Sequence, residues 1–308
     1  MTLPVLAEVI RSGYVEGSHT GSVIALDADG HPVLALGDVD RPVFPRSSNK
    51  PLQAVGLLAQ GWQPEDPRQL ALATASHSGE EGHLDVVREM LAAAGLDEDA
   101  LGCPRMLPLN EAAAHALLAR GEQASRLTMN CSGKHAAMLA AAVVNGQPTQ
   151  SYLDSTHPVQ VRLYRTLEEL AGERIEHVAV DGCGAPQHAL SLHGLARAFA
   201  GLQREVADAM RENPWHVGGT GRDVTQLMEQ VPGLVAKDGA EGVYAVALAD
   251  GSAVALKIED GAARARTPVL VAALRRLGVE GLDELATTPV LGGGVAVGEV
   301  RVTPLLTA

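Results

Sequence analysis

The sequence predicts an α+β fold, in which strands near both ends of the chain form an antiparallel sheet and the middle is largely helical. Two hairpin patterns carry this prediction. The first joins residues 20–26 and 32–36 through an Asp-Ala-Asp-Gly turn, and the second joins 242–248 and 253–258 through an Asp-Gly turn. Such turns between β-rich runs are typical of hairpins. Strands grouped apart from helices favour α+β over alternating βαβ.

Between the hairpins, apolar residues recur at the spacing of amphipathic helices. The predicted helices are 80–94, 110–120, 135–144, 158–170 and 187–198, with another at 263–277. A short apolar strand at 178–180, expected to be buried, ends at Asp181. No internal repeat, low-complexity tract or polar linker marks a boundary, so we expect a single domain over residues 1–308. Two intertwined subdomains are the alternative.

Composition narrows the class of protein. The net charge of −13 lacks the basic footprint that nucleic-acid binding requires, and it disfavours docking on anionic lipid. The N-terminus has neither the basic region nor the apolar region of a signal peptide, so we expect a soluble, cytoplasmic protein. The three cysteines, Cys103, Cys131 and Cys183, are too few and odd in number for a disulfide framework.

The first candidate for chemistry is the pair Ser47 and Lys50. In a helix that begins at Ser47 the two side chains share a face, because they are three residues apart. A neutral lysine there could take the hydroxyl proton and make Ser47 a nucleophile. Ser48 would point elsewhere, and Pro51 disfavours helical geometry at Lys50. An N-cap serine followed by a surface lysine is the alternative interpretation.

Two further polar clusters precede predicted helices. Ser76 and His77 lie in a loop before the helix at 80–94, where Ser78 also fits a helix cap. Capping does not account for Ser76 or His77. The second cluster crowds the start of the helix at 135–144 and consists of Asn130, Cys131, Ser132 and Lys134. A helix N-terminus lowers a thiol pKa and attracts anions. The alternative is a cap beside an inert buried thiol.

Two more candidates come from strands. Asp181 and Cys183 lie between glycines where the strand at 178–180 ends, a position that often carries a site, although a tight turn would also explain them. Cys131 and Cys183 are 52 residues apart and lack zinc-finger spacing, so the residues alone do not predict a metal site. Lys257 lies inside an alternating strand, and a solvent-facing strand residue is its alternative interpretation.

Taken together, these segments resemble the rhizobial-type L-asparaginases, the asparaginase II family. The matching runs are PRSSNKP (45–51), ASHSGE (75–80), NCSGKH (130–135), DGCGAP (181–186), GTGR (219–222), GAEGVY (239–244) and ALKI (255–258). As a set in this order the runs are highly specific.

The resemblance implies a fold similar to that of serine β-lactamases and bacterial serine glutaminases. It also implies two catalytic serine–lysine pairs, Ser47 with Lys50 and Ser76 with Lys257. The implied zinc ligands are Cys131, Lys134 and Cys183, with Asp181 beside the metal and the substrate. Arg46, His77 and Asn130 would help to hold the substrate.

The reaction that the resemblance implies is hydrolysis of L-asparagine to L-aspartate and ammonia, through a serine acyl-enzyme with lysine bases, by a homodimer. Two alternatives remain open. A penicillin-recognising-type serine acylase would normally be exported and carry Lys-Thr-Gly on its late strand, where this chain has Leu256-Lys257-Ile258. A non-catalytic metal- or amino-acid-binding protein would need the cysteines but not Ser47.

Overall fold

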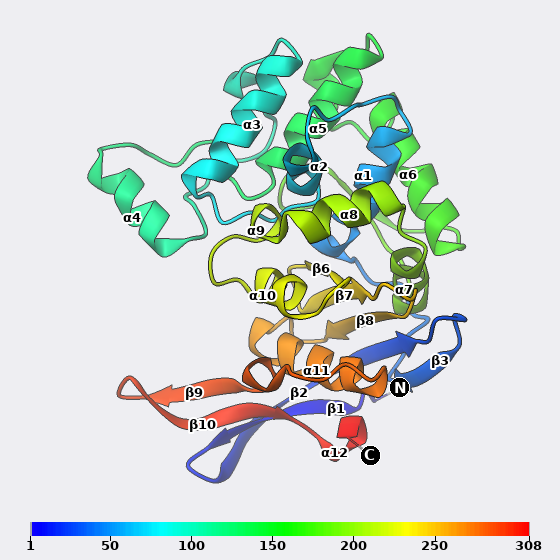
Figure 1. Ribbon diagram of the computed structural model, residues 1–308, viewed down its shortest axis with the longest axis vertical. Helices are drawn as coiled ribbons and strands as arrows, with labels where there is room; N and C mark the ends of the chain where they lie inside the picture. The colour runs from blue at the N-terminus through cyan, green and yellow to red at the C-terminus, as the bar shows by residue number, and fades with distance from the viewer. Residues whose placement is uncertain (1, 308) are drawn as a thin grey trace. The chain divides into compact units, whose positions relative to one another are not determined.

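The computed structural model describes residues 2–307, and the chain forms two compact units (Figure 1). The first unit combines the chain up to Ser48 with Leu190–Gly201 and the chain from Gln230 onward. The second unit combines Asn49–Ala189 with Leu202–Glu229. One unit holds an antiparallel sheet and the other is largely helical, which confirms the predicted fold class. The expectation of a single domain stays a prediction.

The sheet of the first unit has the order β6-β7-β8-β2-β1-β10-β9, with β3 also paired to β2, and all pairs are antiparallel. The strands are β1 (Val5–Arg11), β2 (Tyr14–Leu26), β3 (Pro32–Leu36), β6 (Val235–Asp238), β7 (Val243–Ala247), β8 (Ala253–Ile258), β9 (Thr288–Gly292) and β10 (Val295–Val302). The long strand β2 pairs with β1 through its first half and with β8 and β3 through its second. The N-terminal and C-terminal strands therefore share one sheet, as predicted.

Both predicted hairpins are present, and the glycine of each turn adopts the backbone conformation that the turn requires. In the β2–β3 turn, Gly30 has a φ of 82° and its N–H donates to the Asp27 carbonyl at 3.0 Å. In the β7–β8 turn, Gly251 has a φ of 94° and donates to the Leu248 carbonyl at 3.2 Å. Positive φ is accessible to glycine without strain, so each Asp-Gly run fixes its own turn.

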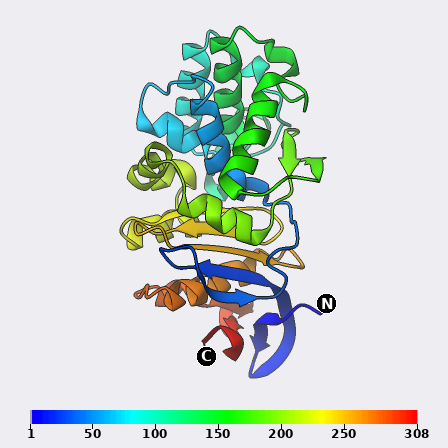
Figure 2. The ribbon, with the colours of Figure 1, turned by 90° about the vertical axis from the view of Figure 1, so that its right-hand side faces the viewer.

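Two helices cover this sheet. Figures 1 and 2 show α7 (Leu192–Ala200) and α11 (Ala263–Arg276) on opposite sides of it, and both pack against β2, β7 and β8. Every residue of β7 is buried, as expected for a strand with both faces covered. The single turns η4 (Asp283–Leu285) and α12 (Pro304–Thr307) complete the unit. The helix predicted at 263–277 is confirmed.

The second unit is built around α5 (Ser132–Val144), whose residues from Ser132 to Ala142 are all buried. Its many alanines let α1, α2, α3 and α6 pack closely on it. The unit contains η2 (Glu98–Ala100), η3 (Thr149–Ser151), α1 (Lys50–Leu58), α2 (Pro67–Ala73), α3 (Glu81–Ala93), α4 (Glu111–Ala119), α6 (Pro158–Ala171), α8 (Arg204–Glu212), α9 (Pro214–Val217) and most of α10 (Asp223–Gln230). Across residues 2–307, no helix combines the length and apolar character needed to cross a bilayer.

One predicted helix, 187–198, is wrong at its start. Pro186–His188 forms strand β5, which pairs antiparallel with β4 (Val178–Val180), and α7 begins only at Leu192. The Ser191 hydroxyl caps α7 by accepting the N–H of Gly194 at 2.8 Å, so the cap overrides the apolar spacing that extends before it.

The strand β4 itself is confirmed but not buried. Val178 and Val180 are 51% and 78% exposed, because only one neighbouring strand pairs with it.

Candidate active site

Ser47 lies in a 3-10 turn, η1 (Arg46–Asn49), that leads directly into α1. Its side chain is partly exposed, and within residues 2–307 its hydroxyl has no hydrogen-bond partner. Ser48, in contrast, is fully buried and donates to the Lys237 carbonyl at 3.2 Å. Arg46 has a φ of 52°, a conformation that costs a non-glycine residue energy and that is often found at functional sites. The geometry thus leaves Ser47, not Ser48, available to a ligand.

Lys50 is the first residue of α1 and is only 1% exposed. Its Nζ donates to the Ala75 carbonyl and lies 3.2 Å from Ser76 Oγ and 3.1 Å from Cys131 Sγ. Pro51 fits here because the N–H groups of a first helical turn have no partner within the helix. Because its amine is within hydrogen-bonding distance of the Ser76 hydroxyl, Lys50 can exchange a proton with Ser76 directly.

The segment from Ala75 to Glu80 has no regular structure although most of it is buried. Its backbone is fixed by neighbours, since the His77 N–H donates to the Asn130 carbonyl at 3.1 Å. The His77 ring is fixed too: Nδ1 accepts from the Gly79 N–H at 3.2 Å, which assigns the proton to Nε2, 2.9 Å from Ser132 Oγ. Burial lowers the pKa of His77 far below its usual range. The neutral ring therefore anchors the segment to α5, and its predicted contact with substrate stays a prediction.

The predicted ligand trio meets at the start of α5. Cys131 is the N-cap residue of this helix and Lys134 lies in its first turn, with Nζ 3.2 Å from the sulfur of Cys183, which follows β4. Asp181 adds a carboxylate oxygen 3.6 Å from that sulfur. Asn130 Oδ1 is 3.5 Å from Cys131 Sγ. Residues from two distant segments thus form one buried group of two thiols and an amine.

Charge is shared unevenly within this group. The hydrogen bond to Cys131 and the Lys134 ammonium lower the pKa of Cys183, whereas the same hydrogen bond and burial raise the pKa of Cys131. Burial opposes the charge of Lys134, but the two sulfurs and Asp181 raise its pKa on balance. Within this group the surroundings therefore favour negative charge on Cys183 and positive charge on Lys134.

No local pattern in the sequence predicted the hydrogen bonds of Tyr152 and His135, which lie behind this group. The Tyr152 hydroxyl accepts the Gly102 N–H at 2.8 Å and forms a second hydrogen bond, 2.6 Å long, with His135 Nδ1. His135 follows Lys134 on α5 and is fully buried. This chain of hydrogen bonds fixes the ring beside the cysteine–lysine group.

In the first unit, Lys257 and Arg46 meet at Glu241. Lys257 Nζ donates to the carbonyls of Glu241 at 2.6 Å and Ile258 at 2.8 Å. The Glu241 carboxylate lies 3.6 Å from Arg46 Nη1, and its backbone φ is 59°. Burial lowers the pKa of Lys257, although the nearby carboxylates of Glu259 and Glu241 oppose this. The predicted pairing of Lys257 with Ser76 stays a prediction.

A second lysine near Ser48 was missed. Lys237 is fully buried in β6, and its Nζ contacts the Asp238 carboxylate. Arg266 of α11 lies 3.6 Å from the same carboxylate and donates to the Gly239 carbonyl at 3.0 Å. The available signal was the charged pair Lys237-Asp238 directly after the apolar run Leu234-Val235-Ala236. Paired in this way, Lys237 holds the backbone against which Ser48 rests.

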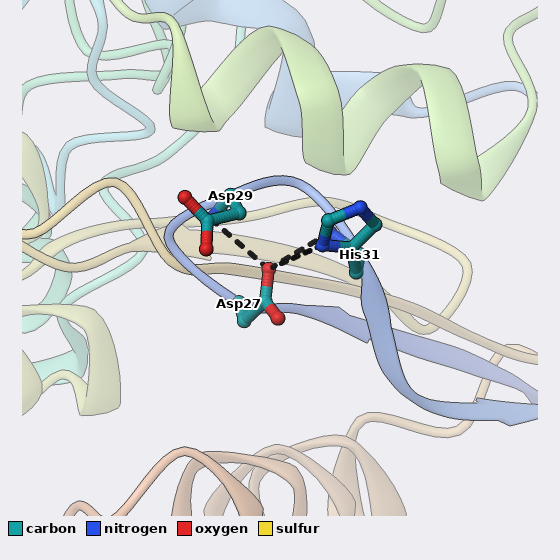
Figure 3. Close-up of side chains that lie close together, drawn as sticks. All are labelled: Asp27, Asp29 and His31. Carbon is teal, nitrogen blue, oxygen red and sulfur yellow. Dashed lines mark hydrogen bonds and ion pairs between the residues drawn. The ribbon is translucent and has the colours of Figure 1, made fainter.

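Asp27, Asp29 and His31 bring three metal-ligand side chains together in the β2–β3 turn (Figure 3). The Asp27 carboxylate already accepts the N–H groups of Asp29 at 3.0 Å and His31 at 2.8 Å. Such bonds are typical of an aspartate that begins a turn. The exposed cluster is explained by turn formation.

Comparison with known proteins gives one family match: the family described as L-asparaginase II matches residues 7–302. No curated protein matches the chain. Among solved structures, the chain is similar to one titled as a structure of Mglu, with 14% identity, a TM-score of 0.42 and coverage of 87% of this chain and 70% of that one. For a structure titled as Mglu in its tris and glutamate form, the identity is 15% and the TM-score is 0.43, with coverage of 93% of this chain and 66% of that one. For a structure titled as a β-lactamase from Mycobacterium bovis, the identity is 14% and the TM-score is 0.39, with coverage of 84% of this chain and 95% of that one.

Proposed function

Because this chain belongs to the L-asparaginase II family, we propose that it hydrolyses L-asparagine to L-aspartate and ammonia through an acyl-enzyme on Ser47. The observation that carries the proposal is the contact of 3.2 Å between the buried Lys50 amine and Ser76 Oγ. Ser47, three residues before this lysine in the chain, supplies the nucleophile, and its hydroxyl has no hydrogen-bond partner among the residues that the structure describes.

Acylation begins with Ser47 Oγ attacking the side-chain amide carbon of asparagine. Lys50, in its neutral form, takes the hydroxyl proton as the carbon–oxygen bond forms. The proton then passes through the Ser76 hydroxyl to the amide nitrogen, and the carbon–nitrogen bond breaks to release ammonia. Preorganised donors must stabilise the tetrahedral oxyanion, and the Ser47 N–H is our candidate for one of them.

Deacylation reverses these roles. Water attacks the ester carbonyl, and Lys50 accepts a proton from the water. The ester bond breaks, the proton returns to Ser47, and aspartate leaves. Lys257 acts in this scheme as a second base whose pKa is lowered by burial. Arg46, Asn130, His77 and Asp181 hold the polar groups of the substrate.

The buried cysteine–lysine group fits zinc by its chemistry. Two sulfurs and one amine are suitable tetrahedral zinc ligands, and Cys131, Lys134 and Cys183 would hold the ion with Asp181 beside it. Zinc would supply a Lewis acid to hold the α-amino or α-carboxylate group of the substrate. Binding requires Lys134 and Cys131 to lose their protons. We also expect a homodimer and a cytoplasmic location.

The test is to add L-asparagine to the purified protein and measure ammonia and aspartate together. Equal amounts of both products support the proposal, and the Ser47→Ala variant should release neither. A chromogenic β-lactam in the same assay separates the acylase alternative. Binding of asparagine by calorimetry with no product from the parent protein would mean a non-catalytic binding protein.

A further inference from the structure

Residues 217–222, which join α9 to α10, lie against the segment that carries Ser76; we call them the strap. The Ser76 N–H donates to the Val217 carbonyl at 3.2 Å, and Arg222 Nη1 donates to the Ser76 carbonyl at 3.3 Å. Two residues further on, Ser78 Oγ donates to the Gly218 carbonyl at 2.9 Å. The strap therefore binds both backbone groups of Ser76.

Thr220 fastens the middle of the strap to Glu80. The Glu80 carboxylate accepts the Thr220 N–H at 2.9 Å and the Thr220 hydroxyl at 2.7 Å. The same hydroxyl oxygen accepts from Trp215 Nε1 at 3.0 Å. Because the acceptor is ionised, these hydrogen bonds are stronger than those between neutral groups.

At Gly219 the strap lies so close to the segment from Ser78 to Glu80 that a side chain would not fit between them. Gly219 has a φ of 118°, and a Cβ there would collide with the side chains of Ser78 and Glu80. Gly221 also has a positive φ, 72°, but a Cβ there would meet no atom within 4 Å. Glycine is therefore required at position 219 by the close packing against Ser78 and Glu80, as well as by the positive φ of the turn.

With these contacts, each polar group of Ser76 has a partner: the N–H is held by Val217, the carbonyl by Arg222, and Oγ lies beside Lys50. We propose that the strap is a positioning device for Ser76 and that Arg222 is its principal positioning residue. This inference rests on the proposed function of Ser76 as the group that passes a proton. A guanidinium bound to the carbonyl restrains the Ser76 backbone, and with it the Cα–Cβ bond that carries the hydroxyl.

The test compares Arg222→Met with Arg222→Lys, and takes Arg204→Met, an arginine 93% exposed on α8, as the control. In Arg222→Met we expect kcat to fall about tenfold to hundredfold, because a small displacement of a reacting group costs rate, while KM stays within about twofold. Arg222→Lys keeps a donor and should fall less. A rise in KM with kcat retained would mean that Arg222 contacts the substrate, and it would overturn the proposal.

Hydrogen–deuterium exchange gives a readout that does not need activity. If the strap holds Ser76, the peptide containing Ser76 should exchange about tenfold faster in Arg222→Met than in the parent, since a charge-assisted hydrogen bond is lost. Unchanged exchange would overturn the proposal whether or not the parent releases ammonia. If Arg222→Met fails to fold, Gly219→Ala should show the same loss, larger than in Gly221→Ala. Equal effects of the two alanines would also overturn it.

Discussion

The amine of Lys50 lies 3.2 Å from the hydroxyl of Ser76, although 26 residues separate them in the chain. The same amine is 3.1 Å from the sulfur of Cys131. Lys50 therefore contacts both Ser76, to which the proposed mechanism assigns a proton transfer, and Cys131, which is one of the proposed zinc ligands. Neither link follows from local spacing, and both bear on the predictions below.

Ser47→Ala should abolish ammonia release without unfolding the protein, because the change removes only a partly exposed hydroxyl. Ser48→Ala removes the buried hydrogen bond to the Lys237 carbonyl and should lower stability by about 1 kcal/mol while most activity remains. Asparagine turnover and thermal melting of both variants check this. An inactive Ser48 variant beside an active Ser47 variant would reverse the assignment.

Activity should rise with pH to a plateau that begins below the pKa of a free lysine. Burial lowers the pKa of Lys257, so its neutral, basic form is populated at lower pH than usual. Glu241 opposes this shift, as do Glu259 and Asp260, whereas Arg41 supports it. Glu241→Gln should therefore move the rising limb of the kcat profile to lower pH, and only slightly, because solvent screens so exposed a carboxylate. A shift to higher pH would contradict the role of Lys257.

The Cys131→Ala, Cys183→Ala double variant should purify without stoichiometric zinc and should bind asparagine poorly. The physical reason is that both sulfurs of the proposed site are lost, while the core of a chain this long does not depend on metal. Cys103→Ala is the matched control, because that buried thiol donates to the Arg126 carbonyl instead. Elemental analysis and a binding titration decide the matter. Full zinc in the double variant, or none in the parent purified with zinc, would refute the site.

Stability should fall between pH 6.5 and about 4, and His188 should account for part of the loss. Burial lowers the pKa of His188 to about 4. The unfolded chain then binds a proton near pH 6.5 that the folded protein does not, so stability is complete above pH 6.5 and is lost as the pH falls. The contribution is at most about 3 kcal/mol.

The rings of His188 and Tyr164 pack edge to face, with their centroids 5.4 Å apart. His188→Phe keeps a ring at this position and removes the titrating group. The fall in denaturation midpoint between pH 7 and pH 5 should be smaller in this variant than in the parent. His115→Phe, at an exposed position on α4, should leave the fall unchanged. Equal slopes for parent and His188→Phe would contradict the prediction.

The sequence by itself determined the local elements of this protein. Asp-Gly turns set both hairpins, and apolar spacing located α3, α4, α6 and α11 to within a residue or two. It also placed the candidate residues in motifs whose order resembles one family, and that family match covers residues 7–302. These features can be predicted from the sequence because each depends on residues only a few positions apart in the chain. Where local signals compete, as before α7, the cap at Ser191 decided instead of the apolar spacing.

Tertiary structure alone decided which of the candidate side chains meet. It buried Ser48 and left Ser47 partly exposed, brought Cys183 to Lys134, and placed Lys50 against Ser76. Tyr152 and Arg222 gained their roles only through contacts with residues far away in the chain. Contacts of this kind depend on how helices and loops pack, and a pattern of period two or 3.6 carries no information about them.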